Sequence, residues 1–399
     1  MKKTVKDIDI KNKKVIMRVD FNVPLDKETN SKITDTTRVD AAMPTIEYIL
    51  SQGASLILMS HLGRPKGEAN PKYSLKPVYD YLKTKLPNNK VIFANDCIGE
   101  EVKKTASSLN AGDVLLLENL RYHAEEEKND ANFSKQLADL ADVYVNDAFG
   151  TAHRAHASTA GIVAAKPSMP ALAGFLMEKE IKYLGDAVAE PKRPFVAIIG
   201  GAKVSSKISV LKNLLNKVDT LIVVGGMAYT FFKAKGYEIG TSLCEDDYIQ
   251  TAKEIMDKAK ELNKTLYLPI DNVVADKFDN DANRKIVDCN AIPSGWMGMD
   301  VGDKTLKEIE NILKSAKTIV WNGPLGVFEM SNFAKGTFET AKFIANSGAV
   351  SIIGGGDSVS AVNKSGVADK MTHISTGGGA SLEFLEGIEL PGIKVLQDK

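Results

Sequence analysis

The sequence of 399 residues has no excess of charge of either sign, because 51 Lys and Arg residues balance 51 Asp and Glu residues. This balance argues against a general electrostatic attraction to nucleic acid or to an anionic membrane, so any basic site must be local. Cysteine is scarce as well: Cys97, Cys244 and Cys289 are odd in number and lack the paired spacing of zinc or redox motifs. We interpret them as small buried or half-buried thiols in a reducing compartment.

Long hydrophobic runs are also missing. No apolar run approaches the length needed to span a bilayer, and the charged start of the chain passes into no apolar segment of a secretory signal. We therefore expect a cytoplasmic protein. The first predicted strand is followed by Arg18-Val19-Asp20-Phe21-Asn22 instead of G-x-G-x-x-G, which argues against a nicotinamide-dependent dehydrogenase.

Short β-branched and apolar runs recur along the chain, and each ends in polar or glycine residues, as is typical of buried strands in a parallel sheet. Stretches with a helical spacing of apolar residues lie between these runs, for example Arg38–Leu50 and Tyr248–Asn263. Strand and helix therefore alternate, which predicts wound α/β domains. The strands are expected at residues 15–19, 56–59, 91–93, 114–117 and 143–145 in the first half, and at 196–199, 221–224, 266–268, 318–320 and 350–353 in the second.

The length of the chain exceeds that of one ordinary core. We expect a bilobal α/β protein with a central cleft, made of two doubly wound, Rossmann-like parallel-sheet domains joined by a bridging helix. Prolines on either side leave Ala171–Ala189 as that helix and as the natural hinge. The expected boundaries are 1–170 for the N-terminal domain, 171–189 for the hinge helix, 190–379 for the C-terminal domain, and 380–399 for a C-terminal segment that packs back near the N-terminal domain.

Cationic side chains gather around the predicted strand ends of the first half. Ligands of wound α/β sheets bind beyond the carboxyl ends of the strands, and arginine and histidine there suit a small anion such as a phosphorylated acid. Taken singly, each arginine is more often a surface ion pair than a ligand, and it is the coincidence of several that favours an anion site. His153 and His156 could also be read as a metal pair, although no nearby run supplies the expected cysteine or carboxylate set. The cationic residues are Arg38, His61, Arg64, Arg121, Arg154 and His156.

Glycine-rich turns occupy the strand ends of the second half. Backbone N–H groups of such turns at helix starts suit a polyphosphate. Lys203 and Lys207 are four residues apart and are predicted on one face of the following helix, while Asp357 is placed to meet Mg²⁺ bound to phosphates. Any single turn could be purely structural, but together they favour a nucleotide site, and two anion sites of different construction suggest a donor and an acceptor. The turns are Gly200–Lys203, Gly225-Gly226, Gly354–Asp357 and Gly377–Gly379.

The chain resembles the phosphoglycerate kinase family along its whole length. The run Val15–Pro24 is similar to the N-terminal signature of that family, and further segments resemble it in the same order. One departure is Ser206, where many family members have Asp, so Asp357 is expected to carry more of any role at the metal. The other similar segments are His61–Pro65, Asp147–Ser158, Gly200–Ile208, Gly295–Gly298, Trp321–Glu329 and Gly354–Asp357.

The resemblance implies a glycolytic kinase that transfers a phosphoryl group reversibly between 1,3-bisphosphoglycerate with ADP and 3-phosphoglycerate with ATP, assisted by Mg²⁺. It implies Arg38 and Lys203 as catalytic residues and Asp357 at the metal, with Arg38 at the reacting carboxylate and Glu329 at the ribose. The implied phosphoglycerate residues of the N-terminal domain are Asp20, Phe21, Asn22, Arg38, His61, Leu62, Gly63, Arg64, Arg121 and Arg154. The implied nucleotide residues of the C-terminal domain are Gly201, Ala202, Lys203, Lys207, Gly225, Gly298, Asn322, Glu329, Gly355, Gly356, Asp357 and Ser358.

The attacking oxygen of such a substrate is already an anion, so the reaction needs no general base, and the absence of an obvious base favours this interpretation. Domain closure and charge stabilisation would carry the catalysis. A non-catalytic nucleotide-binding or scaffold protein on the same fold is the alternative, and it would be expected to lack Arg38, Lys203 or Asp357, all of which are present. The family also implies a monomer, with neither nucleic acid nor a membrane as partner.

Overall fold

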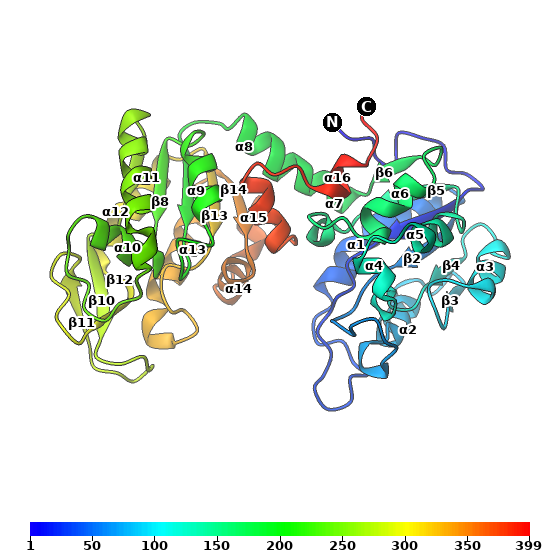
Figure 1. The fold of residues 1–399 in the computed structure, drawn as a ribbon, viewed down its shortest axis with the longest axis horizontal. Helices are drawn as coiled ribbons and strands as arrows, with labels where there is room; N and C mark the ends of the chain where they lie inside the picture. Colours follow the sequence, from blue (N-terminus) through cyan, green and yellow to red (C-terminus); the bar gives the residue numbers. More distant parts are fainter. The chain divides into compact units, whose positions relative to one another are not determined.

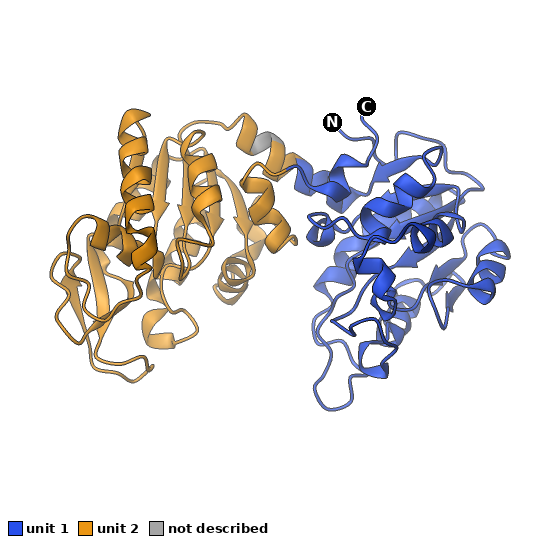
Figure 2. Ribbon diagram, in the orientation of Figure 1, with its two compact units in different colours: residues 1–181, 389–399 blue, residues 182–388 orange. Residues whose placement is uncertain are grey.

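The computed structural model describes residues 1–185 and 188–399. Two compact units can be distinguished (Figure 2): unit 1 contains residues 1–181 and 389–399, and unit 2 contains residues 182–388. Each unit has an apolar core of its own. None of the helices in the described part of the chain combines the length and the apolar character that crossing a membrane requires.

Unit 1 is built on a six-stranded sheet in the order β3-β4-β2-β1-β5-β6, in which every neighbouring pair is parallel (Figure 1). All five residues of β2 are buried, as expected of a parallel strand covered on both faces. Helix α1 turns Val39, Met43 and Ile46 into the core beneath the sheet. The strands are β1 Lys14–Arg18, β2 Ser55–Met59, β3 Val91–Phe93, β4 Val114–Leu116, β5 Val143–Asn146 and β6 Ala171–Ala173. The α-helices are α1 Thr37–Ser51, α2 Lys76–Lys85, α3 Glu100–Ser107, α4 Ala124–Glu127, α5 Ala131–Ala138, α6 Ile162–Ala165, α7 Phe175–Glu180 and α16 Pro391–Lys394.

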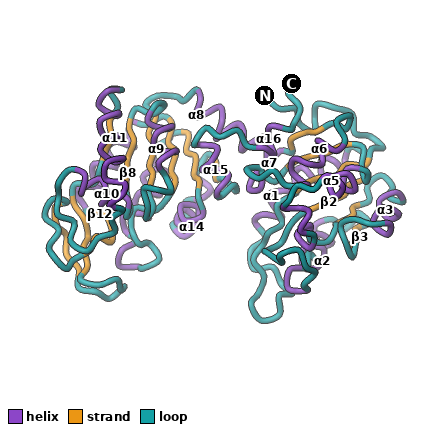
Figure 3. Tube along the Cα trace, viewed as in Figure 1, coloured by secondary structure: helices purple, strands orange, loops and turns teal.

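Unit 2 repeats the design with a parallel sheet of six strands in the order β15-β14-β13-β7-β8-β9, alternating with helices along the chain (Figure 3). The prediction of two parallel-sheet α/β domains is thus confirmed. The sheet strands are β7 Phe195–Ile199, β8 Thr220–Val223, β9 Thr265–Tyr267, β13 Thr318–Asn322, β14 Val350–Gly354 and β15 His373–Ile374. The helices are α9 Ile208–Leu215, α10 Met227–Ala234, α11 Ile249–Glu261, α12 Asp303–Ser315, α13 Lys335–Asn346, α14 Gly356–Lys364 and α15 Gly379–Leu385.

A second, antiparallel sheet in unit 2 was not predicted from the sequence. Its three strands pair in the order β11-β10-β12 and are β10 Asp271–Ala275, β11 Arg284–Asp288 and β12 Met297–Val301. Strand β11 is mostly exposed, so it lacks the continuous apolar run by which the other strands were recognised. Strand β12 matters for the site because it carries Gly298.

The predicted helix Ala171–Ala189 begins later than expected. Residues 171–173 form β6 instead, because they pair with Tyr144, Val145 and Asn146 of β5, a long-range contact that proline spacing does not reveal. Helix α7 starts at Phe175, and the Asp147 carboxylate accepts a hydrogen bond from the Met177 N–H (3.0 Å) in its first turn. Residues 186 and 187 of the predicted helix lie outside the described residues.

The C-terminal segment is divided between the units: residues 380–388 belong to unit 2 and residues 389–399 to unit 1. Within unit 1 the segment lies beside the N-terminus (Figure 1), where Lys2 and Asp398 form a β-bridge. The Asn146 side chain donates a hydrogen bond to the Gly392 carbonyl (3.1 Å), and the Gly392 N–H donates to the Ala152 carbonyl (2.8 Å). The end of the chain is therefore bonded to the residues that follow β5.

Candidate active site

The loops after β1 and β2 and the start of α1 are held together by polar contacts in unit 1. Nη1 of Arg38 donates to both carboxylate oxygens of Asp20 at 3.0 Å and to the Asn22 carbonyl at 3.2 Å. The Asn22 side-chain oxygen accepts a hydrogen bond from the Gly63 N–H (2.8 Å). These predicted site residues therefore form one cluster, and the Arg38 side chain is still 38% exposed and open to a ligand.

Two of the predicted binding residues, Phe21 and Leu62, place their side chains in the core rather than in the cluster. The Phe21 N–H donates to Ser60 Oγ (2.9 Å), and the Leu62 N–H donates to Asn119 Oδ1 (3.2 Å). Their contribution is to fix the loops. Ser60 and Asn119 were missed because a buried hydroxyl or amide that binds backbone has no distinctive sequence pattern.

The three remaining predicted arginines differ in their surroundings. Arg121 is only 5% exposed, and its Nη1 donates to the Gly63 carbonyl at 3.0 Å. Its Nε lies 3.5 Å from a carboxylate oxygen of Glu127 but makes no hydrogen bond within the described residues. Arg64 and Arg154 are exposed, with Nε of Arg154 donating to the ring of His153 at 3.2 Å. Arg121 is therefore enclosed by the fold, whereas Arg64 and Arg154 are open to solvent.

Arg18, at the end of β1, is the main residue that sequence reasoning missed. It is fully buried, and it donates to Ser158 Oγ (2.8 Å), to the Val19 carbonyl and to Nδ1 of His61 (3.1 Å). Because a guanidinium has only donors, Nδ1 of His61 must accept, so the ring carries its hydrogen on Nε2. The signal that could have found Arg18 is a cation directly after the apolar run Val15–Met17 of β1.

The electrostatic field of this site is strongly positive. Burial, followed by the charges of Arg18, Arg121 and Arg38, holds the pKa of His61 well below its usual range. Burial and then Arg121, Arg18 and Arg154 lower the pKa of His156 to about 4. Both imidazoles are therefore neutral at pH 7, and the fixed guanidinium charges remain available to an anion.

The surroundings of His156 also test the hypothesis that His153 and His156 bind a metal ion. His156 faces arginine charges, which repel a cation. Within the described part of the chain, the group of His, Cys, Asp and Glu side chains close enough to share a metal is Asp96, Cys97 and His123. The arrangement at His156 thus favours an anion over a metal.

A glycine-lined cavity of about 380 Å³ lies at the carboxyl end of the sheet in unit 2. Nζ of Lys207 donates to Asn322 Oδ1 at 2.5 Å on its wall, and burial lowers the pKa of this lysine while the carboxylate of Asp357 opposes the shift. Helices α14 and α15 both begin beside the cavity, so backbone N–H groups converge on it. The predicted nucleotide residues that line it are Gly201, Ala202, Lys207, Asn322, Gly355, Gly356 and Asp357.

A second cavity of about 770 Å³ adjoins the first, and both are lined by Gly201, Ala202, Pro324 and Asp357. Gly225, Gly298 and Glu329 were predicted and line it as well. Its remaining wall is mostly apolar and was not predicted, because the residues come from separate segments that only the fold brings together. Those residues include Tyr229, Leu243, Phe278, Met297, Val327 and Met330.

Two glycines of the second cavity tolerate no side chain. Gly225 has a φ of +72°, and a Cβ there would lie 2.7 Å from the Gly201 nitrogen. A Cβ on Gly298 would lie 1.8 Å from the Tyr229 hydroxyl, which is buried and 3.2 Å from Asn272 Oδ1. These positions therefore determine how closely a ligand can approach the backbone.

Two predicted nucleotide residues are placed differently from expectation. Lys203 is exposed and lines neither cavity, and it does not share a helix with Lys207, because α9 begins only at Ile208. The loop between them is held away from helical geometry by Glu245, which accepts from the Ser205 N–H (3.0 Å) and hydroxyl (2.6 Å). The buried Ser358 hydroxyl accepts from the Gly323 N–H (2.6 Å) and so supports the turn after β13.

Asp357 is a suitable ligand for Mg²⁺. Its exposed carboxylate lines both cavities in the first turn of α14 and makes no hydrogen bond within the described part of the chain. Mg²⁺ is commonly held by one or two carboxylates together with phosphate oxygens and water, so a single carboxylate beside a phosphate-sized cavity fits this ion.

Unit 1 presents a cationic site for a small anion, and unit 2 presents a glycine-lined cleft continuous with an apolar cavity. This combination on two wound parallel sheets defines a class of protein, the phosphotransferases that act on a phosphorylated acid and a nucleotide. The family model of phosphoglycerate kinase matches residues 5–388. The chain belongs to the phosphoglycerate kinase family, and it is accordingly an enzyme.

Similar proteins support this assignment over the full length. The chain is 59% identical over 400 residues to the phosphoglycerate kinase of Clostridium botulinum, covering 100% of this chain and 99% of the relative. It is 58% identical over 398 residues to the cytosolic phosphoglycerate kinase 3 of Arabidopsis thaliana, covering 99% and 98%. Among solved structures, the phosphoglycerate kinase of Coxiella burnetii is similar with a TM-score of 0.90 and 42% identity, covering 99% of this chain and 98% of that chain.

Proposed function

We propose that the protein catalyses the reversible, Mg²⁺-dependent transfer of a phosphoryl group from 1,3-bisphosphoglycerate to ADP in glycolysis, giving 3-phosphoglycerate and ATP. The observation that carries this proposal is the presence of two anion sites of different construction, one in each unit. Arginine and histidine tips suit the small acid, and glycine turns suit the nucleotide phosphates.

The acid binds in unit 1. Asp20, Asn22, His61, Arg64, Arg121 and Arg154 hold the phosphoglycerate, and Arg38 reaches the reacting carboxylate. Arg18 supports this arrangement, because its contact with His61 Nδ1 leaves Nε2–H as a donor for an anionic oxygen. The neutral state of His61 follows from its cationic surroundings. Anion binding therefore depends on the guanidinium charges, which persist at any physiological pH.

The nucleotide binds in unit 2. Its base occupies the larger, mostly apolar cavity with Glu329 at the ribose, and its phosphates occupy the glycine-lined cavity beside Lys207 and Asn322. Asp357 would hold Mg²⁺, which supplies positive charge to the phosphate oxygens when bound. We place the base and the phosphates in this way because the larger cavity has mostly apolar walls and the smaller one is lined by glycine backbone.

The carboxylate oxygen of the acid attacks the γ-phosphoryl group of ATP in the reverse direction without a general base, because it is already ionised. The chain's task is to offset the repulsion between two anions and the charge that builds on the equatorial oxygens. We assign this task to Arg38 and Lys203. Lys203 is exposed on the loop before α9 and lines neither cavity, so this role requires its side chain to move toward the phosphoryl group during transfer.

Transfer requires the acceptor of unit 1 to meet the donor of unit 2, so we propose that the units close when both substrates are bound, with the segment 171–189 as the hinge. Small-angle X-ray scattering should then give a smaller radius of gyration with both substrates than without them. An unchanged radius would remove the support for closure.

We also propose a monomer that works in the cytoplasm. The Arabidopsis relative is named as a cytosolic enzyme, which supports this location. The molar mass from size-exclusion chromatography with light scattering should equal that of one chain of 43.2 kDa.

A coupled assay tests the function directly. ADP formation from ATP should require both 3-phosphoglycerate and Mg²⁺, and it should stop when either is omitted. Hydrolysis of ATP at the same rate without 3-phosphoglycerate would contradict the proposed acceptor, and binding of both ligands without turnover would favour a non-catalytic protein.

A further inference from the structure

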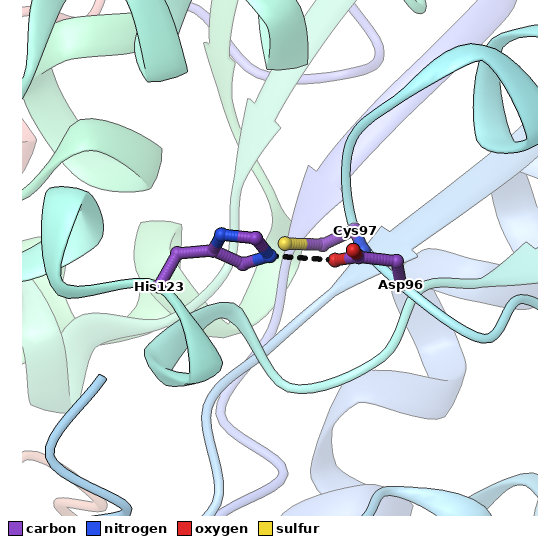
Figure 4. A group of neighbouring side chains, drawn as sticks. All are labelled: Asp96, Cys97 and His123. Carbon is purple, nitrogen blue, oxygen red and sulfur yellow. Dashed lines mark hydrogen bonds and ion pairs between the residues drawn. The ribbon is translucent and has the colours of Figure 1, made fainter. Parts of the chain in front are cut away.

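Three side chains with different donor atoms, none of them assigned to the acid, converge in unit 1 (Figure 4). Asp96 and Cys97 lie in the loop between β3 and α3, and His123 lies between the 3-10 turn Leu120–Tyr122 and α4. A carboxylate oxygen, a thiol sulfur and an imidazole nitrogen, one from each residue, all lie within 4.8 Å of one another. The loops after β3 and β4 therefore bring together a group that the sequence separates.

The burial of the group leaves one open side. The Cys97 side chain is completely buried, whereas the side chains of His123 and Asp96 are 26% and 49% exposed. The thiol thus forms the floor of the group, and the imidazole and the carboxylate form walls that solvent reaches. A small ion can enter from this side without opening the core.

The donor set has a definite chemical preference. Sulfur, imidazole nitrogen and carboxylate oxygen are the ligands that Zn²⁺ takes in proteins, usually four in a tetrahedron. Mg²⁺, a hard ion that prefers oxygen, is not suited to a site with a thiolate. Three protein ligands leave the fourth position to water on the exposed side.

We propose that Asp96, Cys97 and His123 bind a Zn²⁺ ion through Oδ, Sγ and Nε2. On binding, the S–H bond of Cys97 breaks, a Zn–S bond forms and the proton passes to the buffer. Nε2 of His123 offers its lone pair to the ion while its ring hydrogen resides on Nδ1. The two negative charges of the thiolate and the carboxylate balance the charge of the ion.

Two simpler roles can be compared with metal binding. Hydrogen bonding joins the group through Asp96, whose carboxylate lies 2.7 Å from Nε2 of His123 and accepts from the Cys97 thiol, and a bound ion would replace these contacts with three ligand bonds. A redox role would need a partner thiol, but Cys244 and Cys289 are both in unit 2. Burial also raises the pKa of the Cys97 thiol, which makes it a poor nucleophile in the absence of an ion. A bound dication supplies the positive charge that would make the thiolate stable.

The experiment uses the full chain after removal of metals with a chelator. The chain is titrated with Co²⁺ in place of Zn²⁺, because a cobalt–thiolate bond gives a charge-transfer absorption band and tetrahedral Co²⁺ gives intense visible bands. We expect these bands to saturate at one Co²⁺ per chain. One equivalent of Zn²⁺ should then abolish them, whereas a large excess of Mg²⁺ should leave them unchanged.

Variants identify the ligands. Cys97→Ser should remove the charge-transfer band, and His123→Gln should weaken Co²⁺ binding by at least about tenfold, the lower end of the loss seen when even an outer-shell partner is removed. Two variants in unit 2 are matched controls and should bind Co²⁺ as the parent does. Cys289→Ser replaces a buried thiol, and Cys244→Ser replaces a thiol whose sulfur lies 3.5 Å from Asp246. Circular dichroism and the midpoint of urea unfolding check that each variant is folded.

The proposal is overturned if no charge-transfer band forms, if the band survives in Cys97→Ser, or if it is lost in Cys244→Ser. Should Cys97→Ser fail to fold, Asp96→Asn and His123→Gln decide the matter, because both side chains are partly exposed. Unchanged binding in both would refute the site. The readout needs no turnover, so its outcome is independent of the proposed function.

Discussion

Asp300 on β12 gives a quantitative test of the packing behind the nucleotide cleft. Its carboxylate is almost fully buried and accepts hydrogen bonds from the N–H groups of Val301 and Gly336, both at 2.8 Å. A Cβ on Gly326 or Gly336 would lie 2.4 Å or 2.2 Å from Asp300 Oδ1, so backbone encloses the carboxylate closely. Burial outweighs the two hydrogen bonds and raises the pKa of Asp300 from 3.8 to about 7.

The sign of the pH effect follows from this raised pKa. The folded state binds the proton more tightly than the unfolded chain, so the stabilisation is full below about pH 4 and is lost as the pH rises through about 7. Each pH unit between the two pKa values is worth about 1.4 kcal/mol and the slope flattens near pH 7, so from about pH 5 to pH 7 the group costs about 2 kcal/mol of unfolding free energy. Asp300→Asn carries no charge and lacks this cost, although it forfeits one of the two acceptor oxygens.

Urea unfolding measured from pH 5 to 8 checks the prediction, with tryptophan fluorescence as the probe. Trp296 and Trp321 are the two tryptophans of the chain and both lie in unit 2, so the signal reports the unit that contains Asp300. We expect the free-energy difference between the parent and Asp300→Asn to change by about 2 kcal/mol between pH 5 and 7 in favour of the variant. A constant difference for Asp300→Asn would refute the reasoning.

Three further changes test the site. Arg38→Ala should lower kcat by a factor of about 10³ to 10⁵ while leaving the KM for ATP nearly unchanged. Arg284→Ala, at an exposed arginine, is the control. A loss of kcat below about threefold in Arg38→Ala would contradict the assignment. Gly298→Ala places a Cβ 1.8 Å from the Tyr229 hydroxyl, so we expect Tyr229 to shift in the wall of the larger cavity and the KM for ATP to rise at least about tenfold in steady-state assays, the effect of about 1.4 kcal/mol; an unchanged KM would contradict the placement of the nucleotide at this wall. For Lys203→Ala we expect kcat to fall far more than KM rises, and a rise in KM alone would mean a role in ground-state binding.

The sequence was sufficient for the two parallel sheets, because buried parallel strands such as β2 and β7 are continuous apolar runs. It was not sufficient for β6, whose three residues become a strand only by pairing with β5, nor for the antiparallel sheet, in which β11 is mostly exposed. Both β6 and the antiparallel sheet depend on pairing between residues far apart in the sequence, and the local sequence pattern does not predict such pairing.

The candidate site divides in the same way. Strand-end positions led to Arg64 and Arg121 because the carboxyl ends of parallel strands share one edge of the sheet. Arg18 was missed because it lies within a strand, and its role depends on contacts with His61 and Ser158 that only the fold creates. The apolar wall of the larger cavity was missed for a similar reason, since Tyr229 and Phe278 come from different segments.

The central claim is that the acid and the nucleotide bind in separate units, and isothermal titration calorimetry of two variants tests it most directly. Arg121→Met should weaken the binding of 3-phosphoglycerate by at least about tenfold, the cost of a lost charged hydrogen bond, and leave ADP binding unchanged. Gly298→Ala should do the reverse. The opposite pattern, or a loss of both ligands in either folded variant, would contradict the account.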